Sequence, residues 1–215
     1  MVQELKQIPG IEQVTLTTNG ILLGDMMDQL AKAGIDGINL SLDTLNPLVF
    51  EKIARRNDFD KVMKGFEKAL HYPQIPLKVN CVPMGMEQQN VLELAELART
   101  YPVHVRFIEM MPIGLGKQFA FCSEEHLLDG LKQKYGSYIP YETTLGNGPG
   151  HYYSFENFKG KIGFISAISH KFCASCNRVR LTSQGYLKTC LQYDIGVDLQ
   201  KLLREGADDQ QLYFA

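Results

Sequence analysis

The 215-residue sequence lacks several features that would each fix a class of protein. It has no run of about 18 or more apolar residues, no amino-terminal signal pattern and no low-complexity segment. It also lacks an excess of positive charge, because 22 Lys and Arg stand against 24 Asp and Glu, for a net charge of −2. We therefore expect a cytoplasmic globular protein that binds neither membrane nor nucleic acid and that holds any anion through a local group of cations.

Cysteine is also scarce, and its odd count of five is informative. In the reducing cytoplasm, such thiols are more often metal ligands or reactive groups than disulfide partners. Three of them fall in the stretch FCASCNRVRLTSQGYLKTCL, residues 172–191, as Cys173-x-x-Cys176 followed by Cys190. The CxxC spacing places two thiols on one tight loop.

The residues that follow Cys176 predict a hairpin that returns the third thiol to the other two. Residues 178–182 are typical of a strand, residues 183–185 of a turn, and residues 186–190 of the returning strand. With no fourth cysteine nearby, three converging thiolates predict an iron–sulfur cluster with one iron left open, or a zinc site completed by another residue.

His170 is the candidate for that additional zinc ligand, because it lies three residues before Cys173. The two cysteines outside the hairpin have a simpler interpretation. We expect Cys81 to be a buried strand thiol and Cys122 a loop thiol.

Strands and helices alternate over the first half of the chain. The predicted strands are residues 13–17, 37–42, 76–82 and 103–109. The predicted helices begin near Asp25, at Pro47 after the capping residue Asn46, at residue 59 after Asp58, and near Val91. Strict alternation of strand and helix implies a parallel sheet with right-handed crossovers.

After Pro112 this alternation ends. One amphipathic helix is predicted over residues 123–135, the glycine-rich run 146–150 predicts a loop, and residues 152–168 are typical of antiparallel strands. We therefore expect an α/β part and an irregular appendage, with the boundary after residue 112.

The predicted strands carry polar residues on one face. Parallel strands buried on both faces usually appear as continuous apolar runs, whereas here polar and apolar residues alternate with period two. The polar set comprises Thr15, Thr17, Asn19, Asn39, Ser41, Asp43, Lys78, Asn80, His104 and Arg106. Because four consecutive strands share the pattern, we expect the polar sets to line one ligand-binding surface at the carboxyl ends of the strands.

Five motifs occur together in the chain. They are TTNG at residues 17–20, NLSLD at 39–43, KVN at 78–80, RFIEMMP at 106–112, and CxxCNRVRLTxxG…C from Cys173. Together they resemble the molybdenum-cofactor biosynthesis protein A family, the GTP 3′,8-cyclases, which are radical S-adenosylmethionine enzymes. The resemblance covers essentially the whole chain, and the cysteine hairpin with its Arg-x-Arg is its most specific part.

The resemblance implies an α/β fold: an incomplete (β/α) TIM-like radical SAM barrel over residues 1–112, with a C-terminal α+β appendage over residues 113–215 that binds a cluster and GTP. It also implies differences from the family. Members begin with a strand that carries CxxxCxxC, followed by a Gly-Gly-Glu-Pro-like turn, and end in a glycine pair, none of which occurs here. We therefore expect an internal fragment or a truncated reading frame that does not generate the radical alone.

Residue roles follow from the resemblance, position by position. It assigns Cys173, Cys176 and Cys190 to a [4Fe-4S] cluster, Thr17, Lys78, Arg178, Val179 and Arg180 to GTP, and Ser41 and Met111 to S-adenosylmethionine. Guanidinium forks bind phosphate oxygens in pairs, which suits the two arginines. For Lys78, a structural salt bridge to Asp43 or Glu109 is the alternative. Asn19, Asn80 and Arg106 line the same wall as further candidates.

The implied activity is the conversion of GTP to 3′,8-cyclo-7,8-dihydro-GTP in molybdenum cofactor biosynthesis, a lyase reaction. The implied partners are a flavodoxin-like or ferredoxin-like electron donor, a downstream cyclic pyranopterin monophosphate synthase and a second copy of the chain in a homodimer. The alternative is a non-catalytic remnant that binds zinc or a nucleotide.

Overall fold

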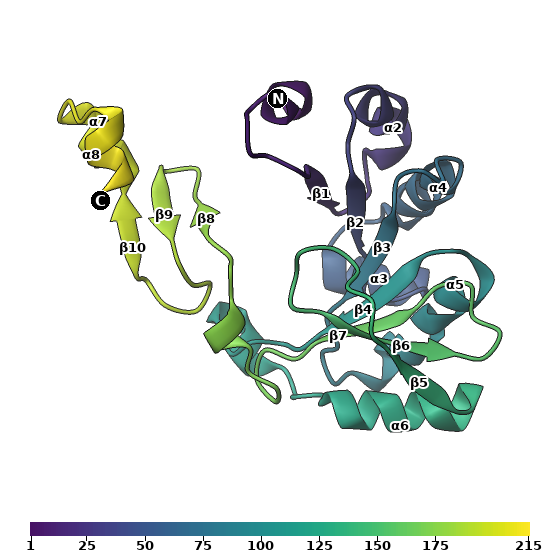
Figure 1. The fold of residues 1–215 in the computed structure, drawn as a ribbon. Helices are drawn as coiled ribbons and strands as arrows, with labels where there is room; N and C mark the ends of the chain where they lie inside the picture. The colour runs from purple at the N-terminus through teal and green to yellow at the C-terminus, as the bar shows by residue number, and fades with distance from the viewer. The chain divides into compact units, whose positions relative to one another are not determined.

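A seven-stranded sheet organises the first of two units into which the chain divides, Met1–Lys171 and Phe172–Ala215. The computed structural model describes all residues from 1 to 215. The strands are β1 (Thr15–Thr18), β2 (Gly37–Ser41), β3 (Leu77–Cys81), β4 (His104–Ile108), β5 (Tyr138–Tyr141), β6 (His151–Phe155) and β7 (Ile162–Ile165). Their order is β1-β2-β3-β4-β7-β6-β5 (Figure 1). Strands β1 to β4 and β7 run parallel, and β6 pairs antiparallel with both of its neighbours, β7 and β5.

Helices connect the first four strands, which confirms the predicted alternation. Between β1 and β4 lie α2 (Leu23–Lys32), α3 (Pro47–Ala54), α4 (Phe59–Leu70), the 3₁₀ turns η1 (Glu87–Gln89) and η2 (Val91–Leu94), and α5 (Ala95–Thr100). Helix α1 (Val2–Lys6) precedes β1, and the 3₁₀ turn η3 (Gly114–Gln118) and α6 (Glu124–Tyr135) follow β4. In Figure 1, α2, α4 and α5 lie along one face of the sheet. The helix expected near Val91 is present, but it begins with the 3₁₀ turn η2 and continues as α5.

A capping side chain sets the start of α3, whereas α4 begins without one. The Asn46 side chain accepts hydrogen bonds from the N–H groups of Leu48 and Val49, and Pro47 occupies the first helical position, as expected. Asp58 precedes α4 without capping it through its side chain, because its carboxylate pairs with the Lys61 ammonium at 2.7 Å.

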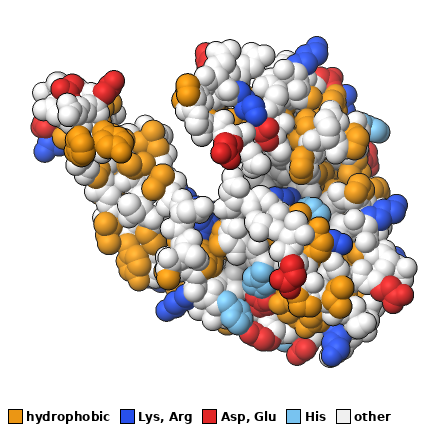
Figure 2. Space-filling view, in the orientation of Figure 1, with side chains coloured by type: hydrophobic (Ala, Val, Ile, Leu, Met, Phe, Trp, Pro, Cys, Tyr) orange, Lys and Arg blue, Asp and Glu red, His pale blue; other side chains and the backbone are white.

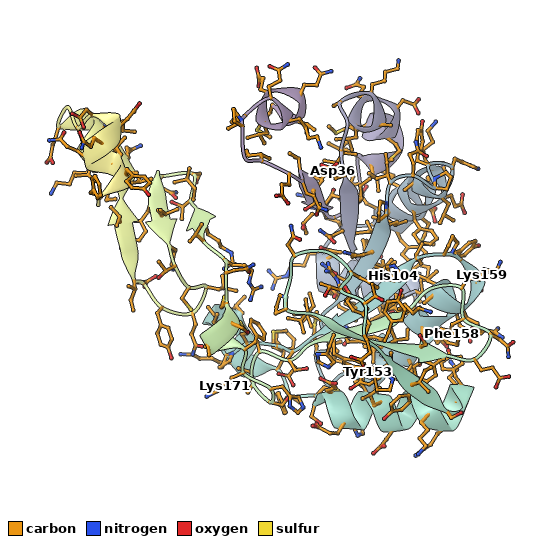
Figure 3. All side chains as sticks on the ribbon, viewed as in Figure 1. Asp36, His104, Tyr153, Phe158, Lys159 and Lys171 are labelled. Atoms are coloured by element: carbon orange, nitrogen blue, oxygen red, sulfur yellow. The ribbon has the colours of Figure 1, made fainter.

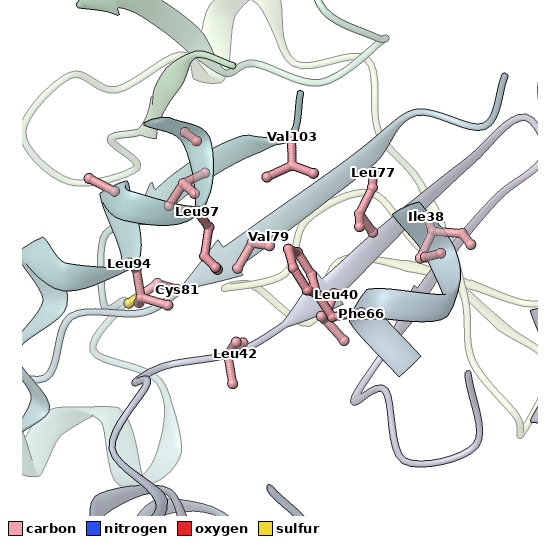
Figure 4. Close-up of a cluster of buried hydrophobic side chains, with 14 of the residues drawn as sticks. Ile38, Leu40, Leu42, Phe66, Leu77, Val79, Cys81, Leu94, Leu97 and Val103 are labelled. Atoms are coloured by element: carbon pink, nitrogen blue, oxygen red, sulfur yellow. The ribbon is translucent and has the colours of Figure 1, made fainter. Parts of the chain in front are cut away.

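The core lies between the sheet and these helices. Apolar side chains at alternate strand positions face it, so that Leu40, Val79 and Val105 are fully buried. They pack with Phe66 of α4 and with residues of η2 and α5, such as Leu94 (Figure 4). The opposite face of the same strands is therefore left to the polar residues.

Helices α2 and α4 approach each other closely through two glycines. A Cβ atom at Gly65 would lie 2.8 Å from the carbonyl oxygen of Gly20 and 3.0 Å from the Cβ of Leu23. A Cβ at Gly24 would meet Gly65 at 3.7 Å, which is ordinary contact. Only Gly65 is therefore required by the packing.

The first unit extends well beyond residue 112. Strand β7 pairs in parallel with β4, and β6 and β5 continue the sheet from there. Residues 112 and 113, between which the two expected parts meet, both lie inside this unit, and that division of the chain stays a prediction. The sheet is mostly parallel and open, with β1 and β5 at its edges. None of the helices is both long and apolar enough to cross a membrane.

The second unit contains the cysteine hairpin. Its elements are the 3₁₀ turn η4 (Cys173–Ser175), β8 (Arg180–Leu181), β9 (Tyr186–Lys188), β10 (Gly196–Asp198), α7 (Leu199–Arg204) and α8 (Asp209–Tyr213). Strands β8 and β9 pair antiparallel, as predicted, and β10 adds a third strand. The hairpin strands are shorter than expected, and Arg178 precedes β8. Several large apolar side chains of this unit are exposed, which Figure 2 shows in orange.

Candidate functional site

Polar side chains form two rows across the parallel strands of the first unit. Strand register places Thr17, Asn39, Lys78 and His104 side by side on β1 to β4. Two residues further along the strands, Ser41, Asn80, Arg106 and Gly163 form the second row on β2, β3, β4 and β7. The alternation predicted from the sequence therefore becomes one continuous surface, which we call the polar rows.

Arg106 links the two rows. Its Nε donates to Oδ1 of Asn80 at 2.7 Å, and its Nη2 donates to Oδ1 of Asn39 at 2.7 Å. Asn39 in turn donates from Nδ2 to Oγ1 of Thr17 at 3.4 Å. Both of these acceptors of the guanidinium are neutral amides, so its charge is oriented without being neutralised.

Gly163 makes room for this arrangement. It lies opposite Arg106 on β7, and a Cβ there would sit 2.5 Å from the Tyr152 ring and 3.1 Å from Cγ of Arg106. The glycine therefore lets Tyr152 and Arg106 approach each other across the sheet. Burial raises the pKa of Tyr152, which keeps its hydroxyl protonated as a donor.

Lys78 is half-buried, and its ammonium donates to the backbone carbonyl of Leu145 at 2.7 Å. It forms no ion pair with Asp43 or Glu109, so the structural salt bridge considered as an alternative is absent. Asp43 accepts instead from the N–H of Val82 at 2.8 Å, and Glu109 accepts from the N–H of Ile168 at 2.7 Å. Burial, with the neighbouring Arg106 charge, lowers the pKa of Lys78.

His104, labelled in Figure 3, is the first residue of β4 and lies opposite Lys78 in the strand register. Its Nδ1 accepts a hydrogen bond from the N–H of Lys161 at 3.1 Å, which leaves Nε2 as the protonated nitrogen of the neutral ring. Burial, together with the charges of Lys78, Lys161 and Arg106, lowers the pKa of His104 to about 4. The ring is therefore a neutral donor at pH 7.

The cations of this surface have no carboxylate partner. None of the ion pairs of the chain involves Lys78, Arg106 or Lys161. The Lys161 ammonium lies 4.9 Å from the centre of the Tyr141 ring, which is a cation–π contact. Since uncompensated charge is costly away from bulk water, this cluster is suited to an anionic ligand.

A cavity of about 270 Å³ opens at the carboxyl ends of β1 and β2. Its lining includes Ser41 together with Asn19, Asp43, Thr44 and Arg56, and apolar side chains such as Phe50. Burial raises the pKa of Asp43. The structure thus places Ser41 in a cavity with polar and apolar walls, which suits a small amphiphilic ligand.

Met111, the other residue expected to bind S-adenosylmethionine, is half-buried after β4 and does not line this cavity. Met111 lies on the chain beyond the second polar row. The two expected cofactor contacts are therefore not brought together in one cavity, and both roles stay predictions.

The three hairpin thiols all lie in the second unit. Cys173 and Cys176 are exposed, and Cys190 is half-buried. No group of three or more His, Cys, Asp or Glu side chains is gathered so that it could hold a metal ion, either here or in the first unit. The expected convergence of the thiols is therefore not formed, and their role as ligands stays a prediction. Metal binding and assembly of such a site are coupled processes.

The chemistry of these thiols nevertheless fits a soft metal. The backbone N–H of Arg178, followed by its side chain, lowers the pKa of Cys176. The backbone N–H groups of Tyr193 and Gln192 lower the pKa of Cys190. Two of the three groups are thus biased towards thiolate, the form that ligates iron or zinc. His170, the alternative zinc ligand, instead pairs with Glu125 at 3.0 Å.

The expected GTP residues of the second unit are accessible. Arg178 is half-buried, and its guanidinium lies 5.0 Å from the centre of the Phe172 ring. Val179 and Arg180 are exposed, and neither arginine is in an ion pair. Both guanidiniums are thus available for an anion, and their predicted contact with GTP stays a prediction.

Three features were missed from the sequence. Leu145 and the glycine run that follows it contact Lys78, Tyr152 contacts Arg106, and Arg56 lines the cavity near Ser41. The run Gly-Asn-Gly-Pro-Gly was a visible signal for the first, since such loops are a common place for anions to meet backbone N–H groups. Nothing in the sequence indicates the other two.

Two sequence models of known protein families match this chain, one over each half. The sequence model described as Radical SAM superfamily matches residues 1–101, and that described as Molybdenum Cofactor Synthesis C matches residues 103–214. These matches, with which the α/β fold is consistent, assign residues 1–101 to the radical SAM superfamily and residues 103–214 to a molybdenum-cofactor synthesis region.

Curated relatives agree with these matches. A GTP 3′,8-cyclase of Desulforamulus reducens is 42% identical over 216 residues, and one of Clostridium perfringens strain SM101 is 41% identical over 213 residues; each alignment covers 99% of this chain and 66% of the relative. Molybdenum cofactor biosynthesis protein 1 of Homo sapiens is 40% identical over 218 residues, which cover 99% of this chain and 34% of that protein. The chain belongs to the molybdenum-cofactor biosynthesis protein A family, and it spans 66% of the length of the cyclases that it matches.

Proposed function

We propose that this chain is the nucleotide-binding part of a GTP 3′,8-cyclase, which converts GTP to 3′,8-cyclo-7,8-dihydro-GTP in molybdenum cofactor biosynthesis. One observation carries the proposal. Lys78 and Arg106 present two positive charges, without a carboxylate partner, on the polar face of a mostly parallel sheet. The names of the relatives supply the nucleotide and the reaction.

In this proposal the residues of the chain bind and orient the substrate. Lys78 holds the polyphosphate, and the neutral His104 and the oriented Arg106 offer N–H donors to the same ligand. Arg178, Val179 and Arg180 contact GTP from the cysteine hairpin, and Thr17 contacts it from β1. The finer fold in this proposal is an incomplete TIM-like barrel with a cluster-binding appendage.

Two cofactors belong to the proposal. S-adenosylmethionine would lie against Ser41 and Met111, since a serine hydroxyl suits its polar groups and a methionine suits its adenine. A [4Fe-4S] cluster on Cys173, Cys176 and Cys190 would supply an open iron position for a nitrogen or oxygen of guanine. A flavodoxin-like or ferredoxin-like protein would supply electrons, a cyclic pyranopterin monophosphate synthase would use the product, and the chain would form homodimers.

The test is nucleotide binding by the full 215-residue chain, prepared without oxygen and supplied with iron and sulfide. Titration calorimetry should show tighter binding of GTP than of ATP, and the Lys78→Met variant should lose most of that affinity. Equal binding of the two nucleotides, or a Lys78→Met variant with unchanged affinity, would contradict the proposal. S-adenosylmethionine should not be converted to 5′-deoxyadenosine by this chain alone, because no CxxxCxxC motif is present in it.

The second candidate is a non-catalytic protein that binds zinc or a nucleotide. It is supported by the exposure of Cys173 and Cys176 and by the lowered pKa of Cys176, since such thiols suit zinc as well as iron. Iron and zinc content after anaerobic purification distinguishes the two. A colourless protein with one zinc, and no gain of GTP affinity on addition of iron and sulfide, would favour the second candidate.

A further inference from the structure

The loop that joins β5 to β6, residues 142–150, arches back over the sheet (Figure 1) and contacts the polar rows at Lys78. The carbonyl of Leu145 accepts from the Lys78 ammonium at 2.7 Å. Two residues further on, Nδ2 of Asn147 donates to Oε1 of Gln13, just before β1, at 3.4 Å. The loop therefore reaches from the far end of the sheet to the chain segment before its first strand.

Gly146 allows the loop to come this close. Its φ is +90°, a conformation that residues with a side chain rarely adopt, and a Cβ there would lie 2.8 Å from Nζ of Lys78. The glycine is thus required both by the backbone conformation and by the space that the ammonium occupies.

The loop has unused hydrogen-bond donors. The backbone N–H groups of Gly146, Asn147 and Gly148 make no hydrogen bond within the chain. Two of these residues, Asn147 and Gly148, are exposed. Free backbone N–H groups beside an ammonium are the usual components of an anion-binding loop.

The present contact does not satisfy Lys78. An ammonium has three donors, and a neutral carbonyl occupies one of them while the adjacent Arg106 adds a second positive charge. A polyphosphate would bring two or more negative charges to the same place. Exchange of the carbonyl for a phosphate oxygen would therefore convert a neutral hydrogen bond into a charge-assisted one.

We propose that residues 145–148 form the second wall of a polyphosphate site, whose first wall is Lys78 and Arg106. On binding, Lys78 releases the Leu145 carbonyl and takes a phosphate oxygen, and the N–H groups of Gly146, Asn147 and Gly148 bind the same anion. This inference rests on the proposed function, because the ligand is the polyphosphate of the nucleotide. It adds a loop, from a different part of the chain, to the residues that hold the substrate.

The test is a charge substitution in the loop. Asn147→Asp places a carboxylate beside the anion, so we expect about a tenfold loss of affinity for both GTP and inorganic tripolyphosphate at low salt. The matched control is Asn157→Asp, since Asn157 is exposed and follows β6, at the opposite end of that five-residue strand from the loop. The control should bind both probes like the unmodified chain.

A direct readout uses NMR of the full chain labelled with ¹⁵N. Addition of tripolyphosphate should shift the amide resonances of Gly146, Asn147 and Gly148 with the same midpoint as the binding curve, and the Asn147→Asp chain should need a higher concentration. Gly146→Ala should weaken binding as well, because the new methyl group competes with the Lys78 ammonium for space.

The outcomes separate this inference from the proposed function. GTP binding that Asn147→Asp leaves unchanged, with no shift of the loop amides, overturns the inference while the function stands. Tripolyphosphate binding that depends on Asn147, without preference for GTP over ATP, supports the inference and contradicts the function. Absence of binding by either probe overturns both.

Discussion

Arg106 donates through Nε to Oδ1 of Asn80 at 2.7 Å, and these two residues face each other on adjacent parallel strands. The amide fixes the plane of the guanidinium but leaves its charge intact. An aspartate of the same shape at position 80 would have formed an ion pair. The choice of amide over carboxylate is what keeps this surface positive, and it can be tested directly.

Asn80→Asp should give Arg106 a carboxylate partner without changing the shape of the site. We expect affinity for tripolyphosphate to fall about tenfold, because one negative charge is added next to the ligand. The free energy of unfolding should stay the same or rise by about 1 kcal/mol, since a half-buried ion pair replaces a neutral contact. Calorimetric titration and urea unfolding measure the two effects. Unchanged anion affinity would show that Arg106 does not face the ligand.

His104 should make the fold less stable in acid. Its pKa is lowered to about 4 by burial and by neighbouring cations, so between about pH 6.5 and pH 4 the unfolded chain binds a proton that the folded chain does not. The contribution of the neutral His104 ring to the free energy of unfolding is therefore complete above pH 6.5 and falls as the pH drops through this window. The loss is expected to be about 1 kcal/mol after allowance for the partial exposure of the ring.

Urea unfolding at pH 7.5 and at pH 5 measures this dependence. His104→Gln should reduce the difference between the two pH values, whereas His71→Gln, at an exposed position after α4, should leave it unchanged. In an NMR titration the His104 ring should stay neutral down to about pH 5. Protonation of that ring near pH 6.5 would contradict the burial of His104 among the cations.

Two glycines in facing helices should respond oppositely to alanine. Gly65→Ala brings a methyl group against the Gly20 carbonyl and Leu23, so we expect a loss of about 1–3 kcal/mol in the free energy of unfolding. Gly24→Ala, within α2, meets α4 only at ordinary van der Waals distance and should be neutral or stabilising by up to about 1 kcal/mol. Urea unfolding measures the change in the free energy of unfolding for each variant. Equal effects would show that the helices are not in close contact at Gly65.

The five thiols should differ in reactivity. Cys81 is fully buried, and burial raises its pKa well above the usual range, so iodoacetamide should not modify it in the folded chain. Cys176 is exposed with a lowered pKa and should react fastest. Addition of iron and sulfide should then protect Cys173, Cys176 and Cys190 together, and leave Cys122 as reactive as before.

Mass spectrometry of tryptic peptides measures each site separately. Chelation of the metal should restore the reactivity of the three hairpin thiols. Protection of only one or two of them would contradict a shared cluster.

The sequence predicted most of the first unit for a simple physical reason. Period-two alternation is enforced by the geometry of a strand, so the residue order alone assigns Asn39, Lys78, Asn80 and Arg106 to one face of the sheet. The capping of α3 by Asn46 was equally local. The start of α4 after Asp58 was also predicted correctly, but the capping role of Asp58 was not, because its carboxylate pairs with Lys61.

Contacts between distant segments were not predictable in this way. The approach of Leu145 to Lys78 joins residues 67 positions apart, and no local pattern encodes it. The parallel pairing of β7 with β4 was not predicted either, since it depends on tertiary packing. The arrangement of three thiols depends on their ligand as much as on their spacing.

The hydrogen bond between Asn147 and Gln13 spans 134 positions of the chain. Contacts of such separation form only after the intervening segments have ordered, because closing a long loop has an entropic cost that nearby packing must first offset. The contact of residues 145–148 with the polar rows is therefore completed late in folding. It also opens first when heat or denaturant destabilises the protein. Amide exchange should find the loop before β6 opening at much lower free energy than the strand that carries Lys78.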